Sequence, residues 1–277
     1  MDPFALRLVL SFALGGATVA LFTTIAERSG SRLGGLLLSF PVKVTISLVF
    51  IAMTEGVAFA SDAAIAVPAG MGVNVVFLGA TALLVRRVEP WPAIVGALAA
   101  WALAGIAVVL WLPHGIVWSL AAWLAPTLLA LALLSRVPGI RGDRKAKSVP
   151  REWNGSDLAS RALGAGAVVA LSIVVAHYAG PILGGLASVF PSGWITTMVI
   201  LTRRHGPQFT ASTVRVMVAG SVAPVVFGIS VALLDTQWGI LGGTLGAMGC
   251  AALTSLTVGA GLRARDRNAL AESEVSA

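Results

Sequence analysis

The feature that most constrains this chain is a series of nine mostly apolar stretches, each close to the length of a membrane-spanning helix. The stretches cover residues 4–26, 33–53, 63–85, 91–112, 115–135, 160–179, 182–201, 211–234 and 239–261. A helix of about 20 apolar residues crosses the hydrocarbon core of a bilayer. Only 11% of the 277 residues are charged, whereas a soluble domain carries about 25%. The sequence therefore predicts an all-α integral membrane protein with nine transmembrane helices.

The loops between these stretches alternate in charge. One set holds 16 of the 19 lysine and arginine residues, namely Arg28, Arg32, Arg86, Arg87, seven between 136 and 161, Arg203, Arg204, Arg263, Arg265 and Arg267. The other set holds Glu55, Asp62, His114, His177 and Asp235. Because cytoplasmic loops are enriched in basic residues, we expect the N-terminus outside and the C-terminus in the cytoplasm. This topology accounts for the net charge of +7, and a nucleic-acid partner is not expected.

The sequence repeats itself at an offset of 150 residues. Residues 13–84 share about 24 identities with residues 163–234 over 72 positions without a gap, including Phe40-Pro41 and Phe190-Pro191. Each copy would contain four helices, and a fifth helix between them would turn the second copy upside down. We therefore expect an inverted-topology repeat, an arrangement typical of secondary transporters.

This repeat divides the chain into five parts. The first four-helix repeat covers 1–112, and the linking helix 5 covers 113–136. A basic cytoplasmic linker covers 137–158, the second repeat covers 159–262, and a cytoplasmic tail covers 263–277.

Residues 177–262 resemble a known family. The resemblance rests on His177-Tyr178, Gly184-Gly185, Phe190-Pro191, the turn Arg203-Arg204-His205-Gly206 and the Pro224 helix. Together they are similar to the GlpM/YdgC-like family of small bacterial inner-membrane proteins, whose members are single four-helix units. The resemblance implies two fused, inverted units in a bacterial inner (plasma) membrane. It brings no settled substrate and no catalytic residue, and the first copy departs from the second in having Lys43 where the second has Gly193.

Prolines interrupt corresponding helices of the two copies. Pro41 lies about nine residues into predicted helix 2, and Pro191 about ten residues into predicted helix 7. Proline lacks the N–H and clashes with the carbonyl four residues back, so we expect the carbonyls of Leu37 and Ala187 to be freed or bent. Broken helices 2 and 7 that cross near the midplane would mark a substrate site. The alternative is that these prolines and the neighbouring glycines only shape a packed helix crossing.

The predicted substrate-binding residues lie near these two prolines. Lys43 is about ten residues from either end of its apolar stretch, and a charge at that depth is by default a functional hypothesis. It would bind a negative group, unless it snorkels or is held by freed carbonyls. We expect Arg215 to guide an anion or to snorkel, Asn74 to bind substrate or a neighbouring helix, and Trp194 to form a wall. The other members of the set are Pro41, Pro191, Ser39, Thr45, Ser47, Ser188, Ser192, Thr196 and Thr197.

Several chemistries are not expected. Glu27, Glu55, Asp62 and Asp235 all lie near the ends of apolar stretches, which disfavours a carboxylate proton relay at the midplane. One cysteine and three widely separated histidines offer no metal-ligand spacing. The sequence predicts no enzyme, no metal and no cofactor, and it does not identify a coupling ion.

Three functions remain in view. The first is a secondary transporter or exporter of a small anionic or zwitterionic solute, working by alternating access. The second is an anion-selective channel lined by the same groups. The third is a non-transporting membrane subunit of a lipid or polysaccharide pathway, in which Lys43 binds lipid phosphate. The expected partners are a small-molecule substrate and membrane lipids, with the chain acting as a monomer or a homodimer.

Overall fold

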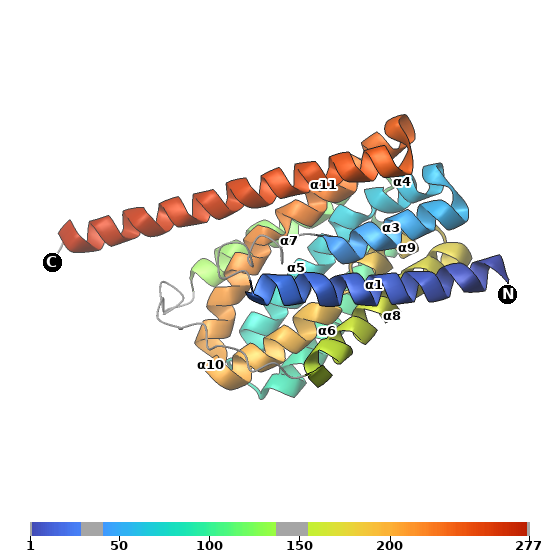
Figure 1. The fold of residues 1–277 in the computed structure, drawn as a ribbon. Helices are drawn as coiled ribbons and strands as arrows, with labels where there is room; N and C mark the ends of the chain where they lie inside the picture. The colour runs from blue at the N-terminus through green and yellow to red at the C-terminus, as the bar shows by residue number, and fades with distance from the viewer. Residues whose placement is uncertain (1, 29–40, 137–154, 276–277) are drawn as a thin grey trace.

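The computed structural model describes residues 2–28, 41–136 and 155–275, and this part of the chain is helical and contains no strand. The helices pack into a bundle from which the end of the last helix projects (Figure 1). In chain order they are α1 (Pro3–Arg28), α3 (Val42–Glu55), α4 (Val57–Ile65), α5 (Val67–Leu84), α6 (Pro90–Trp111), α7 (Ile116–Ser135), α8 (Gly155–Ala179), α9 (Pro181–Ser188), α10 (Ser192–Gly220) and α11 (Val222–Val275).

Seven helical stretches of the described chain are long and apolar enough to cross a membrane. This count differs from the predicted nine at two places. The first part of the predicted stretch 33–53 lies outside the described residues, and α3 alone has 14 residues. The predicted stretches 211–234 and 239–261 fall in one continuous stretch, Gly206–Gly261, in which the backbone departs from helical geometry at Gly239. The fold is all-helical and compatible with a multi-pass membrane protein.

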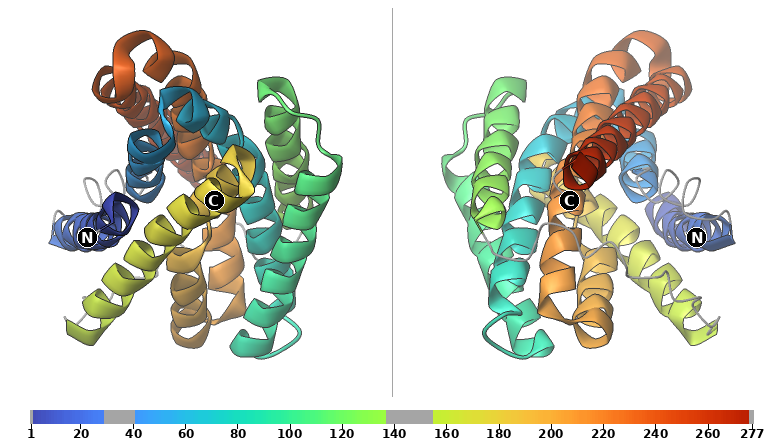
Figure 2. Two further views of the ribbon diagram at one scale, coloured as in Figure 1. Left: turned by 90° about the vertical axis from the view of Figure 1, so that its right-hand side faces the viewer. Right: turned by 90° about the vertical axis from the view of Figure 1, so that its left-hand side faces the viewer.

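The outer face of α6 and α7 is apolar. Both helices pack against α5, on the flank of the bundle opposite α1 (Figure 2). Leu103, Trp111 and Val117 are 68%, 77% and 74% exposed. An apolar surface of this kind would cause association in water, but it suits contact with lipid chains.

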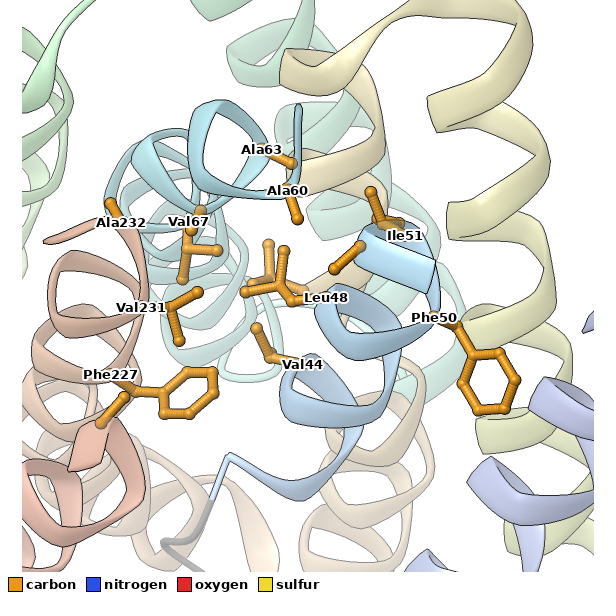
Figure 3. Packing of buried hydrophobic residues seen from close by; sticks show 14 of the residues in the cluster. Val44, Leu48, Phe50, Ile51, Ala60, Ala63, Val67, Phe227, Val231 and Ala232 are labelled. Atoms are coloured by element: carbon orange, nitrogen blue, oxygen red, sulfur yellow. The ribbon is translucent and has the colours of Figure 1, made fainter. Parts of the chain in front are cut away.

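Two hydrophobic clusters form the core. The first joins α3, α4, α5, α8 and α11, and Leu48, Phe227 and Val231 point toward one another in it (Figure 3). The second joins α5, α6, α7 and α10 around Phe77, Leu78 and Met198. Trp194, near the start of α10, packs against both clusters, so it lies where the two parts of the core meet.

Backbone turns recur at equivalent positions of the two sequence copies. Gly56 ends α3 with φ 100°, and Gly206 interrupts α10 with φ 83°. Both values lie in the region that only glycine adopts without strain. Pro41 and Pro191 precede α3 and α10 with φ −80° in both cases and ψ of 44° and 36°. The identities at an offset of 150 residues therefore coincide with similar local geometry.

Glycines allow α1 and α8 to cross at close range. A Cβ atom added to Gly16 would lie 2.7 Å from the carbonyl oxygen of Ala162, and one added to Gly166 would lie 2.5 Å from that of Phe12. Real Cβ contacts are not this short, so both positions require glycine. The two contacts are reciprocal, because residues 12 and 16 stand 150 positions before residues 162 and 166.

The helix predicted between the two copies is observed as α7, and a hydrogen bond connects it to α5. Pro68 stands in the first turn of α5, and the N–H of the next residue, Ala69, donates to Ser119 Oγ at 2.9 Å. One turn further along α7, Trp123 Nε1 donates to Ser221 Oγ, also at 2.9 Å. Ser221 is the residue between α10 and α11. Helix α7 therefore satisfies polar groups at helix ends from both sequence copies.

Candidate functional site

The candidate site is built around a break in the helical backbone. Helix α9 ends at Ser188, α10 begins at Ser192, and Val189, Phe190 and Pro191 connect them. The predicted interruption at Pro191 is therefore present. The Ala187 carbonyl was predicted to be freed or bent. It is not freed, because this oxygen accepts a hydrogen bond from the Phe190 N–H at 3.1 Å, three residues on instead of the four of an α-helix. The chain turns tightly after α9 instead of continuing as a kinked helix, which leaves the carbonyls of Val189 and Phe190 outside the helical pattern.

Asn74 binds the first of these two carbonyls. Its Nδ2 donates to the Val189 oxygen at 2.7 Å, and the side chain is 2% exposed. Asn74 belongs to α5, in the first sequence copy, and Val189 to the second. A buried carbonyl without a partner costs about 1–3 kcal/mol, so this amide stabilises the break.

Lys43 binds the second carbonyl. Its Nζ donates a hydrogen bond to the Phe190 oxygen, across 147 residues of sequence. Lys43 is half-buried, and it stands in the first turn of α3, which begins at Val42. The sequence placed Lys43 near the middle of predicted helix 2, two residues after the interruption at Pro41. In the structure it is the second residue of α3, which Pro41 precedes. Residues 29–40, including Ser39 and Leu37, lie outside the described residues.

Among the described side chains, none neutralises the charge of Lys43. Its observed partner is a neutral carbonyl, and no carboxylate pairs with it among the described side chains. A charge taken out of water is costly unless it is paired, so an ammonium group of this kind favours an anion beside it. This electrostatic feature is the strongest indication of ligand chemistry at the break.

Trp101 completes the arrangement, and the sequence interpretation did not include it. Its Nε1 donates to Asn74 Oδ1 at 2.8 Å, and its ring meets the Phe190 ring edge-on at a centroid distance of 5.1 Å. Because Oδ1 accepts from the indole, the Nδ2 end of the Asn74 amide faces the Val189 carbonyl. One signal could have found it: Trp101 lies in the middle of the stretch 91–112, where an interfacial tryptophan is not expected.

The predicted hydroxyl residues differ in what they contact. Thr45, Ser188 and Thr197 donate to carbonyls of their own chain segment, those of Pro41, Gly185 and Gly193. Ser47, one turn after Lys43 on α3, is fully buried, and its hydroxyl has no hydrogen-bond partner among the described residues. Ser192 is half-buried at the start of α10, and the side chain of Thr196 lies outside the described residues. Of this set, Ser47 retains unused hydrogen-bonding capacity.

The remaining predicted residues flank the break. Trp194 follows it on α10 and joins the two core clusters. Arg215 is half-buried further along α10. The structure therefore brings Lys43, Asn74, Pro191 and Trp194 to one region, and adds Trp101.

A second contact between the sequence copies lies at helix ends. His177 Nδ1 and Glu55 Oε1 are 2.6 Å apart, with side chains 41% and 20% exposed. Phe4 of α1 lies against the imidazole at a centroid distance of 4.6 Å. No group of three or more potential metal ligands occurs in the described part of the chain.

Comparison of the chain with protein-family models, with curated proteins and with solved structures gave no match. Its function is therefore inferred from the geometry above.

Proposed function

We propose that this chain is a secondary transporter or exporter of a small anionic or zwitterionic solute, located in a bacterial inner membrane and working by alternating access. The observation that carries the proposal is the Lys43 ammonium beside a broken helix, whose partner among the described residues is a neutral carbonyl. In transporters, broken helices and their exposed backbone groups commonly form the substrate site. Lys43 would exchange the Phe190 carbonyl for a negative group of the solute.

An inverted repeat is the second part of the proposal, and the α1–α8 crossing supports it. When two equivalent segments are related by a twofold axis, residue i of one meets residue j of the other, and j meets i in return. Gly16 against Ala162 and Gly166 against Phe12 form such a reciprocal pair at an offset of 150 residues. The equal backbone angles at Pro41 and Pro191 agree with it. Nine spans, with the N-terminus outside, remain the topology that fits this repeat and the loop charges.

Alternating access then becomes a motion of one copy against the other. The hydrogen bonds that cross the break all run from side chains of the first copy to carbonyls of the second. A rocking motion that separates Lys43 from Phe190 would free the ammonium group, whereas the Phe190 carbonyl would keep its hydrogen bond from the Ser192 N–H at 2.9 Å. Trp194, between the two core clusters, lies where such a motion has to be accommodated.

The proposal is tested by ligand-dependent thermal stability of the purified chain in detergent. The panel contains inorganic phosphate, sulfate, acetate and glycine betaine, with choline as the cationic control. A ligand that binds only the folded state raises the melting temperature by mass action. We expect at least one anion or zwitterion to raise it in wild type and in Lys43→Arg, but not in Lys43→Met.

The matched control is Arg7→Met, which removes a half-buried cation from α1, outside the predicted site, and should leave the shift unchanged. Equal shifts in wild type and Lys43→Met would remove Lys43 from the site. A response to choline alone would exclude an anion carrier. With a responding anion in hand, flux into liposomes that saturates would support a carrier, and fast ohmic flux would indicate a channel instead.

A further inference from the structure

Asp235 is buried although it stands close to a turn. It lies on α11 four residues before Gly239, and the three intervening residues are exposed. Asp235 itself is only 2% exposed. Its Oδ1 is buried and has no hydrogen-bond partner among the described residues. The sequence grouped this carboxylate with the loop charges, so its burial is a new observation.

The position equivalent to Asp235 in the other sequence copy is apolar. At the offset of 150 residues its equivalent is Val85, which is 6% exposed. Residues 81–85 and 231–235 share the same order of buried and exposed positions. The carboxylate therefore occupies a position that a valine fills in the other copy. A charged group buried without a partner is strongly unfavourable, so this position favours a neutral side chain.

The returning segment of α11 closes the site from one side. A Cβ atom added to Gly243 would lie 2.2 Å from Asp235 Oδ1. The carboxylate thus lies directly against the backbone of the segment that follows the turn. Between Oδ1 and Gly243 there is no room for a further group.

No described charged group on a neighbouring helix compensates for the free-energy cost of burying the Asp235 carboxylate. No ion pair of Asp235 occurs among the described side chains, and α5 carries no titratable residue. The other helices that contact α11 are α3, α4 and α10, and they do carry titratable or charged residues. These are Lys43 and Glu55 on α3, Asp62 on α4, and Arg203, Arg204, His205 and Arg215 on α10. The side chains of Arg204 and His205 lie outside the described residues. Asp62, on the helix packed most extensively against α11, is exposed and has the same sign of charge.

We propose that Asp235 is a proton-binding site. A proton from the adjacent water adds to the carboxylate to give a neutral carboxylic acid, and its release regenerates the carboxylate. A divalent cation would need several oxygen ligands, and no cluster of three acidic, histidine or cysteine side chains exists among the described residues. A single buried carboxylate whose Oδ1 has no partner among the described residues therefore matches a proton better than a metal ion.

The charge on Asp235 bears on a contact between the two sequence copies. One turn before it, the carbonyl of Ala232 accepts a hydrogen bond from Ser61 Oγ of α4 at 2.7 Å. Helix α4 follows α3, which carries Lys43, and α11 turns back beside α4 (Figure 1). Protonation would thus alter the packing of α4 on α11, and so the placement of α3. This coupling step rests on the proposed transport function, whereas proton binding itself does not.

The experiment is an infrared titration of the full chain in detergent, between mildly acidic and mildly alkaline buffer. We expect a protonated-carboxyl band in wild type that disappears as the buffer becomes alkaline. The band should be absent from Asp235→Asn and retained in Asp62→Asn, the control that neutralises the exposed carboxylate of α4. Because this titration needs no solute, it gives a result even when no anion binds to the Lys43 region.

A second variant covers the case in which Asp235→Asn does not fold. Asp235→Val installs the residue found at the equivalent position, and in mildly alkaline buffer its melting temperature should exceed that of wild type. A wild-type spectrum without a band assignable to Asp235, or a melting temperature lowered by Asp235→Val, would overturn the proposal. A band that responds to sodium chloride but not to choline chloride would assign the site to sodium and overturn it as well.

Discussion

The two sequence copies share their backbone turns but differ in the polar groups placed beside them. Lys43 in the first copy corresponds to Gly193 in the second, and Asn74 corresponds to Pro224. At the break, the first copy supplies the side-chain donors, and the second supplies the carbonyls that accept from them. Two copies with identical polar groups could not divide these roles. The asymmetry, more than the shared fold, is what marks this region as a candidate site.

The largest expected effect comes from removing the amide that links the copies. Asn74→Leu leaves the Val189 carbonyl and the Trp101 N–H without partners, at about 1–3 kcal/mol for each buried group. We expect a clear fall in melting temperature and a change in tryptophan fluorescence. Thr197→Val, which removes only a hydrogen bond within α10, should have a much smaller effect. Equal effects of the two variants would contradict a special role for Asn74.

The second-largest effect is expected from substitution of one of the two glycines on either side of the break. A Cβ atom at Gly185 on α9 would lie 2.1 Å from the Ala63 carbonyl oxygen, whereas one at Gly193 on α10 would meet nothing within 4 Å. Gly185→Ala should therefore destabilise the fold by about 1–3 kcal/mol through overpacking. Gly193→Ala should not lower the melting temperature, and Gly193→Lys should be accommodated. A tolerated Gly185→Ala would show that α9 and α4 are not packed this closely.

A smaller effect is expected at the contact between His177 and Glu55. The two side chains are 41% and 20% exposed, so solvent screening limits the pair to about 0–1 kcal/mol. Glu55→Gln and His177→Gln should each lower the melting temperature slightly. The melting temperature of the double variant should be no lower than that of the less stable single variant. Additive losses would mean that the two side chains act independently.

The positions equivalent to Glu55 and His177 in the repeat provide a further test of how the two copies are related. At an offset of 150 residues, position 27 carries glutamate where 177 carries histidine, and position 205 carries histidine where 55 carries glutamate. The side chains at 27 and 205 lie outside the described residues, so the repeat alone motivates the test. In a chain with Cys250 replaced, cysteines at 27 and 205 should cross-link, as should cysteines at 55 and 177. Cross-linking of the second pair alone would argue against a twofold relation.

Local chemistry explains what could be predicted from the sequence. Stretches of apolar residues predicted the helical class, and Pro191 predicted the break, because hydropathy and the missing proline N–H act within a few residues. Lys43 was identifiable as a charge within an apolar stretch. The partners of these groups were not predictable, because Asn74 and Val189 are 115 residues apart in sequence and meet only through packing. The burial of Asp235 could have been inferred from its alignment with Val85.

The most direct test of the central claim is counterflow of a responding anion in liposomes that contain the purified chain. Counterflow requires a carrier that exposes one site to each side in turn, and it needs no imposed driving force. We expect wild type to exchange labelled for unlabelled anion with saturation, Lys43→Arg to retain exchange, and folded Lys43→Met to lose it. Exchange by Lys43→Met at the wild-type rate would contradict the assignment of the Lys43 ammonium as the anion-binding group.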